Sequence, residues 1–375
     1  MQDYKFEDEK GRIREIRRKA LEKYPELEMP ESIRTPGRTW TRYPDLEDEI
    51  PEISDTDPEI IVDGDAAFWT GVDAAEEAGE KLLNSIKPEE NKLNALHSAY
   101  INSLIYVKVD GEADVKIKHE SNQPLFSHLV VETGDNTDVK VKEEFRGNDV
   151  SVQTSFTEIY TGKNSHVNYG AVESLDAELS YSRRKAIVNK DSSINWLNSQ
   201  FESDLNRTQI DTVLKGDNSR TEKIAVWYPI DEQHIDISLK AFHQGTNTKC
   251  DMDSRAVVDN QARSLYEGLQ QVEQQAEDTS SFQDQETLML SDNAESDASP
   301  KLMIENPDVE ASHAAAAGNI PKKEQHYLES RGLTQEQAER LVVKGYFEPV
   351  MQKITLPRLK ETVRKEVQRK LEKTQ

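Results

Sequence analysis

The side chains best suited to bind a soft metal in this sequence are one thiol and a few imidazoles. Cys250 is the single cysteine, and His243 precedes it by seven residues across the loop-like stretch around GTNTK. A thiolate and an imidazole can share an iron or zinc ion, because both supply the lone pairs that these metals prefer. A lone cysteine can equally be a small apolar core residue, so both interpretations of Cys250 stay open.

His313 is a second candidate ligand, and it stands between Ser312 and four consecutive alanines. Such small neighbours leave the imidazole accessible and allow another backbone to approach it. A structural hydrogen bond would explain the same histidine without any metal. The histidines that we interpret as ordinary surface or packing residues are His97, His119, His128, His166 and His326.

The segment 324–350 carries a candidate partner-binding surface. Thr334 and Gln337 have the spacing of a capping box, and Gly332 and Gly345 stand where left-handed C-caps would end two short helices. Helices this short cannot bury all of their apolar residues against each other, so some must pack on the body of the protein or on a partner. Arg331 is placed to make a bidentate contact with a carboxylate. The candidate partner-binding residues are Tyr327, Leu328, Arg331, Leu333, Leu341, Val342, Tyr346 and Phe347. A cap that closes the end of a sheet is the alternative interpretation.

Residues 101–315 are predicted to form the β core that positions these groups. Apolar residues alternate there, as in Val139 and Val141, and this period of two indicates strands with one buried face. Turn signals such as Gly134-Asp135-Asn136 recur at intervals close to 13 or 14 residues or twice that. Regular punctuation on this scale favours a β-solenoid, in which each coil covers the next. A two-sheet sandwich is the main competitor.

Helical regions are predicted on both sides of this core, over 1–100 and 316–375. The first contains helices at its start and before residue 100, separated by an acidic, proline-rich arm over 36–65 that reads as extended chain without a folded layer. The last contains the two short helices and, after Pro349, an amphipathic helix with Leu359, Val363 and Val367 on one face.

Composition excludes several classes of function. The formal net charge is −24, which repels nucleic acid and anionic lipid, so we expect neither as a partner. The N-terminus lacks the apolar run of a secretory signal, and no stretch approaches the roughly 20 apolar residues of a membrane span. We therefore expect a soluble, cytoplasmic protein.

Phosphate loops, GxGxxG, HExxH and GxSxG signatures are missing from the sequence.

Several ungapped motifs give the sequence a resemblance to a known family. They are TKCDMDSRAVVDNQARSLYEG, AEDTSSFQDQETLMLSDNA, PKLMIENPDVEASHAAAAG and YLESRGLTQEQAERLVVKGYF, in this order between residues 248 and 347. They resemble the SufB/SufD family, the scaffold proteins of the SUF system for iron–sulfur cluster assembly. Weaker similarity extends upstream to about residue 95.

The resemblance implies a right-handed β-helix flanked by helical regions. It also implies pairing through the β-helix, here through strands close to Met289 and His313, and docking of a SufC-like ATPase through C-terminal helices. SufB carries a cysteine in the neighbourhood that matches Asp284-Gln285-Glu286, and a glutamate where this chain has Ala314. The sequence is therefore SufD-like at its site.

The resemblance thus predicts a non-enzymatic scaffold subunit. Its partners would be a SufC-like ATPase and a SufB-like chain, or a second copy of itself. Its cargo would be a transient iron–sulfur cluster at a dimer contact, where His313 contributes one imidazole and the other chain completes the site. From the residues alone, two other classes stay open: a β-helix polysaccharide lyase or hydrolase, and a purely structural solenoid adaptor.

Overall fold

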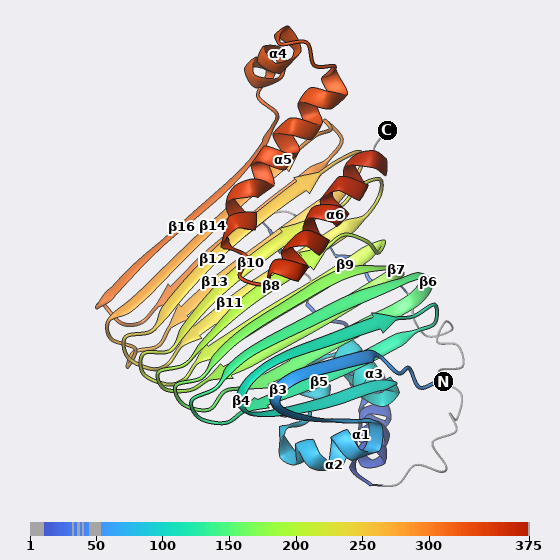
Figure 1. Cartoon of the computed structure of the whole chain (residues 1–375), viewed down its shortest axis with the longest axis vertical. Coiled ribbons are helices and arrows are strands. Elements are labelled where there is room, and N and C mark those ends of the chain that lie inside the picture. The colour runs from blue at the N-terminus through green and yellow to red at the C-terminus, as the bar shows by residue number, and fades with distance from the viewer. Residues whose placement is uncertain (1–10, 32–33, 36–37, 40, 45–53, 374–375) are drawn as a thin grey trace.

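A computed structural model describes residues 11–31, 34–35, 38–39, 41–44 and 54–373 of the chain (Figure 1). Helical elements lie at both ends of the sequence, and strands fill the middle. The helical elements are α1 (Arg12–Lys23), η2 (Tyr24–Glu26), α2 (Gly71–Ala78), η3 (Gly79–Lys81), η4 (Pro88–Glu90), α3 (Lys92–Tyr100), α4 (Lys322–Ser330), α5 (Gln335–Lys353) and α6 (Pro357–Lys373). The first three strands are β1 (Arg34–Thr35), β2 (Arg38–Thr39) and β3 (Glu59–Thr70).

The remaining strands form a β-helix. They are β4 (Ser103–Glu120), β5 (Leu125–Thr133), β6 (Asp138–Tyr160), β7 (His166–Val188), β8 (Ser193–Gln200), β9 (Leu205–Leu214), β10 (Arg220–Trp227), β11 (His234–His243), β12 (Lys249–Val258), β13 (Arg263–Val272), β14 (Thr279–Met289), β15 (Glu295–Ile304) and β16 (Val309–Asn319). One parallel stack runs β8-β10-β12-β14-β16 and the other runs β9-β11-β13-β15, while β7 pairs with both β8 and β9. The β-helix prediction is confirmed, and the two-sheet sandwich is not the fold.

Asparagine or aspartate in a left-handed conformation marks one corner of each coil. Asn136, Asn164, Asp191, Asn218 and Asn247 have φ between 52° and 60° and follow each other at intervals of 28, 27, 27 and 29 residues by subtraction. These two residue types tolerate that conformation better than other non-glycine residues. Their side chains also form a ladder from coil to coil, in which the Asn164 amide donates to the Asn136 carbonyl at 2.8 Å.

The turn signals of the sequence therefore mark coil corners, and one of these corners lies inside a continuous strand. Gly147-Asn148-Asp149 lies inside β6, where the pairing with β7 shifts register between Gly147 and Val150. The long strand bends at this point and continues into the second stack, so the signal marks a coil corner that takes the form of a β-bulge.

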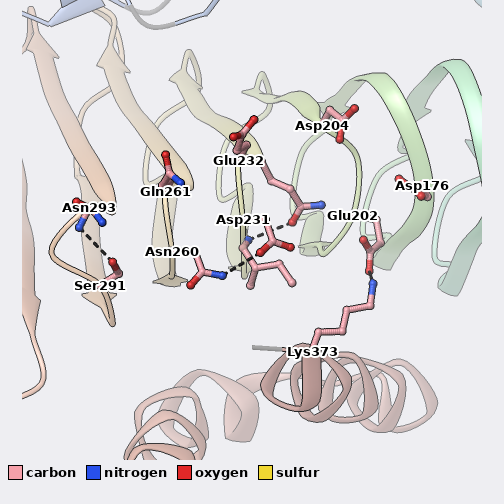
Figure 2. Close-up of a pocket in the computed structure, with 12 residues that line it drawn as sticks. Asp176, Glu202, Asp204, Asp231, Glu232, Asn260, Gln261, Ser291, Asn293 and Lys373 are labelled. Atoms are coloured by element: carbon pink, nitrogen blue, oxygen red, sulfur yellow. Dashed lines mark hydrogen bonds and ion pairs between the residues drawn. The ribbon is translucent and has the colours of Figure 1, made fainter. Parts of the chain in front are cut away.

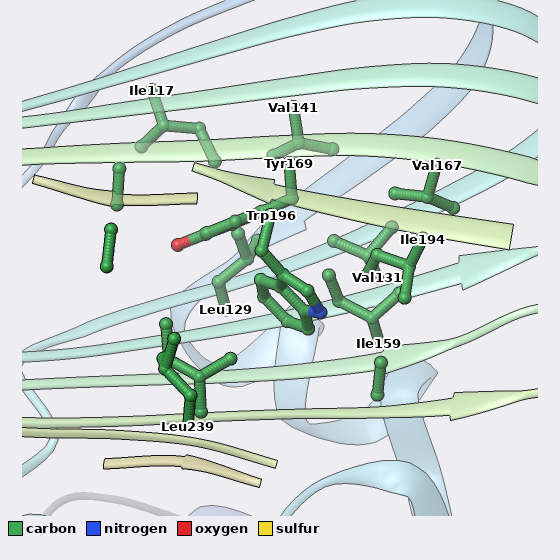
Figure 3. Packing of buried hydrophobic residues seen from close by; sticks show 14 of the residues in the cluster. Ile117, Leu129, Val131, Val141, Ile159, Val167, Tyr169, Ile194, Trp196 and Leu239 are labelled. Atoms are coloured by element: carbon green, nitrogen blue, oxygen red, sulfur yellow. The ribbon is translucent and has the colours of Figure 1, made fainter. Parts of the chain in front are cut away.

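Apolar side chains fill the space between the two stacks (Figure 3). In one column of this core, Val115, Val141, Tyr169 and Trp196 occupy the same register position on successive coils. The Tyr169 and Trp196 rings meet edge to face at 5.1 Å between centroids, and Trp196 Nε1 donates to Thr212 at 3.0 Å. Such large, hydrogen-bonded aromatic rings stabilise the interior strongly because they bury much apolar area.

The N-terminal helices α1, α2 and α3 cover the first coil (Figure 1). Leu93, Leu96 and Ala99 of α3 are buried with Phe126 and Phe156 of the β-helix. These helices cover the open edge of the first coil. A solenoid needs such a cap at its ends, because no further coil buries the terminal one.

Part of the predicted arm belongs to the sheet, which corrects that prediction. Glu59–Thr70 is β3, and it pairs antiparallel with β4 through contacts such as Ile60↔Ile117. The run IIV provides β-branched residues for a half-buried strand, and β4 offers an otherwise open edge. The acidic residues 45–53 of the arm lie outside the described residues.

The predicted end of the second short helix at Gly345 is wrong. α5 runs without interruption from Gln335 to Lys353 and carries Pro349 inside it. Its buried residues, including Val343 and Phe347, pack on the β-helix, and this tertiary contact outweighs the local cost of glycine and proline in a helix. The Thr334–Gln337 capping box and the positive φ of Gly332 are both present as predicted.

α5 and α6 lie along the outer face of the β8-β10-β12 stack (Figure 1). Val363 and Leu359 of α6 are fully buried there. Gly170 on β7 permits this close contact, since a Cβ at that position would stand 2.5 Å from a methyl group of Leu359. The two helices therefore form one unit with the β-helix, whereas α4 projects beyond it.

Candidate functional site

His313 lies on the last strand of the β-helix. Among the described strands β16 pairs only with β14, so its other side presents unpaired backbone groups. The register aligns Trp196, Lys223, Met252, Gln283 and His313 on consecutive strands of one stack. Aligned residues of parallel strands point to the same side of the sheet, so His313 ends the inner column that includes the core tryptophan. It is exposed because no described strand covers this end.

The strands next to His313 in sequence and in the stack also expose apolar side chains. Phe282 on β14 and Met303 and Ile304 on β15 are among the large hydrophobic residues that reach solvent. An edge strand with open hydrogen-bonding groups beside apolar side chains is typical of a surface that pairs with another chain.

A cleft of ≈ 490 Å³ joins His313 to the end of α5. Its walls come from β10, β12, β14, β16 and the last residue of α5. They are formed by Glu222, Asp251, Met252, Asp253, Phe282, Gln283, Asp284, Ser312, His313, Ala314 and Lys353. Acidic side chains predominate, and they stand on successive coils.

Ion pairs fix the floor of this cleft. Lys353 Nζ donates to Asp253 Oδ2 at 2.6 Å, so the C-terminal end of α5 is tied to β12. Arg255 contacts the other oxygen of Asp253 at 3.1 Å and reaches Asp284 at 3.1 Å and Glu286 at 3.3 Å. These ion pairs therefore connect α5 with β12 and β12 with β14, the strand that pairs with the strand of His313.

Cys250 is in the interior of the β-helix and not at this cleft. It is fully buried on β12, and burial raises the pKa of its thiol to about 12, which keeps the sulfur protonated and a poor ligand. Its register partner on β14 is Ser281, which pairs with Ala311 of β16. Two strand spacings of about 4.8 Å separate Cys250 from the strand of His313, so the two cannot bind one ion within ordinary ligand distances.

His243 is likewise buried, and hydroxyl groups occupy both of its ring nitrogens. Nδ1 contacts Thr248 at 2.8 Å and Nε2 contacts Ser281 at 3.1 Å. Nearby, burial lowers the pKa of Lys223 to about 8, while its ammonium donates to the carbonyl oxygens of Ile210 and Lys240. The sequence pair His243 and Cys250 therefore belongs to a polar patch of the core.

His243 predicts an acid sensitivity of folding. Burial lowers its pKa from 6.5 to about 4, so the unfolded chain binds a proton that the native chain does not, and the free energy of unfolding falls as the pH falls through this window. The difference of 6.5 − 4 = 2.5 pH units corresponds to about 3 kcal/mol. We expect urea midpoints of the wild type to drop between pH 7 and pH 4, and those of His243→Gln to drop less.

His326→Gln is the matched control, because His326 is exposed on α4 and should leave the pH dependence of the wild type unchanged. Identical pH slopes for His243→Gln and the wild type would contradict the assignment.

The predicted partner-binding residues, on α4, α5 and the turn between them, separate into three groups by their exposure. Tyr327 and Leu341 are 57% and 51% exposed, and the Arg331 guanidinium lies 5.2 Å from the centre of the Tyr327 ring. Leu328, Leu333, Val342 and Tyr346 are half-buried. Phe347 is 1% exposed and packs beside Tyr228, so it is a core residue and does not contribute to the surface that was predicted.

A second, larger cleft of ≈ 730 Å³ lies where the coil corners face the end of α6 (Figure 2). Asp176, Asp204, Asp231 and Glu232 come from neighbouring coils on its wall. Glu202 accepts ion pairs from α6 residues, among them Lys373 at 3.2 Å. The charged contacts here hold α6 against the β-helix.

Sequence reasoning missed the charged residues that connect α5 with the His313 cleft. Asp253 and Asp284 stand 31 residues apart, and Lys353 is 100 residues beyond Asp253. Only the coil repeat brings the two aspartates to adjacent positions. The repeat was detectable in the turn spacing, but the position of α5 on the sheet was not.

Comparison with known proteins identifies the family. The family model described as "SUF system FeS cluster assembly, SufBD core domain" matches residues 115–346. This chain belongs to the SufBD family. It is 27% identical to the iron-sulfur cluster assembly protein SufD of Bacillus subtilis, over 96% of this chain and 94% of that protein.

More distant SufBD proteins match over a shorter range. A family protein of Staphylococcus epidermidis is 22% identical over 75% of this chain and 63% of its own length. One of Staphylococcus aureus is 23% identical over 79% of this chain and 66% of its own length. The near-complete match to SufD agrees with the SufD-like residues of the site.

Two properties follow from the part of the chain that the structure describes. None of its helices is long and apolar enough to cross a membrane. No three of its His, Cys, Asp and Glu side chains converge closely enough to hold a metal ion. Within the described residues, His313 therefore belongs to no such group of three.

Proposed function

We propose that this chain is a non-catalytic scaffold subunit of the SUF system that acts in the cytoplasm. It pairs through the last coil of its β-helix with a SufB-like chain or a second copy of itself. The cargo is a nascent iron–sulfur cluster, held transiently at that contact by His313 and by ligands of the other chain. The observation that carries the proposal is the place of His313, at the uncovered end of the inner column on an edge strand.

The incomplete ligand set supports a shared site. A cluster needs several thiolate or imidazole ligands, and the only thiol of this chain is buried two strands away from β16. The exposed apolar residues around the last coil fit a permanent contact, which typically buries more than about 2,000 Å². The SufBD family argues against a polysaccharide lyase or hydrolase, and a purely structural adaptor would not explain an exposed imidazole at this place.

A SufC-like ATPase docks on α4 and α5 in this proposal. The exposed ends of Tyr327 and Leu341, with Arg331 between the helices, form the docking surface. The Lys353–Asp253 ion pair links the far end of α5 to the strands beside His313. ATP-driven movement of the docked subunits would thereby alter the cluster contact.

Anaerobic purification of the tagged chain from its native host tests the proposal. We expect an ATPase and a second SufBD chain in the purified complex, with visible absorption from bound iron and sulfide. At micromolar concentration, light scattering should show a dimer, either of the free chain with itself or of the chain with an added SufB-like chain. A monomer under both conditions, without an ATPase, would contradict the proposal.

A further inference from the structure

A cleft of ≈ 630 Å³ on the opposite stack contains four cationic side chains. It lies between residues 28–31, which follow η2, and the outer face of the stack from β7 to β15. The cations are Arg183 on β7, Arg207 on β9, Lys240 on β11 and Lys301 on β15. Its volume is in the range of pockets that bind small molecules.

Three of these four cations already have carboxylate partners. Arg183 contacts Glu90 at 3.0 Å, while Lys240 and Lys301 contact Glu267 at 3.3 and 2.7 Å. These pairs neutralise much of the charge and hold the side chains in place.

Arg207 is different. The residue is only 5% exposed, and its Nη1 is buried without any hydrogen-bond partner. No ion pair joins Arg207 to another residue in the described part of the chain. Burying a guanidinium without an anion is costly, because the charge loses its hydration and gains nothing in return.

The nearest acid in register does not compensate for this. Asp236 stands directly beside Arg207 on β11, where Thr41 donates to its Oδ2, while its Oδ1 lies 2.7 Å from His234 Nε2 without forming a hydrogen bond. Within the described residues, no hydrogen bond or ion pair joins this carboxylate to Arg207. Among the described residues, Arg207 is thus the cation of this cleft that lacks a carboxylate partner.

We propose that this cleft binds a small oxyanion, a phosphate or a dicarboxylate, with Arg207 as its principal ligand. A guanidinium offers parallel N–H groups that match two oxygens of either anion. Lys240 and Lys301 add positive potential at the same wall. The acidic residues Glu28 and Glu31 line the cleft as well, but they are exposed, so solvent screens their repulsion. A small ligand fits better than a macromolecule, because Arg207 is deeply buried. The site is independent of the proposed scaffold role.

Calorimetric titration of the full chain with inorganic phosphate, and separately with succinate, tests this site. Chloride at equal ionic strength serves as the blank. We expect saturable binding of at least one oxyanion, and a loss of about tenfold or more in affinity for Arg207→Gln, the usual size of a charged hydrogen bond. The stronger of the two responses tells which oxyanion class fits the cleft.

Arg220→Gln is the matched control, since Arg220 is an exposed arginine at the start of β10. It should bind like the wild type. If Arg207→Gln fails to fold, Arg207→Lys keeps the charge while losing the paired N–H groups, and it should fold and bind more weakly. Absence of binding by the wild type, or equal affinity in the wild type and the Arg207 variants, would overturn the proposal.

Discussion

Replacing Tyr327 and Leu341 together with Asp is expected to abolish co-purification of the SufC-like ATPase and to leave the thermal transition unchanged. Both side chains are more than half exposed, so the folded chain loses little packing when they become charged. In the proposed complex the same carboxylates would be buried against apolar surface. At about 2 kcal/mol for each of the two contacts, the affinity should fall by about 1,000-fold.

Phe347→Asp provides the opposite control on the same helix. Phe347 is buried against the β-helix, and truncation of such a residue costs about 3–5 kcal/mol before any charge is added. Its melting temperature should fall sharply. If the Tyr327/Leu341 variant still binds the ATPase, the docking site is not on α4 and α5. If the variant loses much of its thermal stability, Tyr327 and Leu341 support the fold instead.

His313→Ala is expected to lower the yield of iron–sulfur cluster in the complex by about tenfold or more while the chain folds and binds its partners normally. The imidazole is exposed at the end of the inner column, and Ala is already the residue type at its next four positions. Removal of one ligand from a shared site weakens binding of the cargo, since the remaining ligands must hold it alone. Iron and sulfide content of anaerobically purified complexes gives the measurement.

His326→Ala controls for the loss of an exposed histidine and should leave the yield unchanged. Lys353→Met tests the link to α5, because it removes the ion pair with Asp253 without touching His313. We expect this variant to bind the ATPase and to lose the coupling between ATP hydrolysis and cluster yield. Normal cluster yield in His313→Ala would return this residue to a structural role.

Local chemistry allowed much of the fold to be predicted from the sequence. Alternation of apolar residues requires half-buried strands, and Asn or Asp at positions such as Asn164 and Asn218 supplies the left-handed corner that each coil needs. Thr334 and Gln337 form their capping box because it involves only residues three apart. The motifs between residues 248 and 347 pointed to the SufBD family, which the family match confirms.

Other features depended on contacts between distant residues. Gly345 and Pro349 look like helix ends, yet α5 continues through them because Val343, Phe347 and Val350 gain burial on the β-helix. Cys250 is buried because further strands stack beyond β12, and His313 is exposed because β16 is the last strand of its stack. The residues near each of them in the sequence do not show how many strands follow.

The sequence by itself thus determined the repeating β-helix, its flanking helices and the family, because these follow from periods, turns and motifs that are local in the chain. Only the tertiary structure decided which of the candidate ligands reaches solvent, which apolar residues of α5 are core, and which charges meet. The physical reason is that burial and ion pairing depend on the stacking of coils 27 to 31 residues apart, as where Arg255 on β12 reaches Asp284 on the neighbouring strand β14.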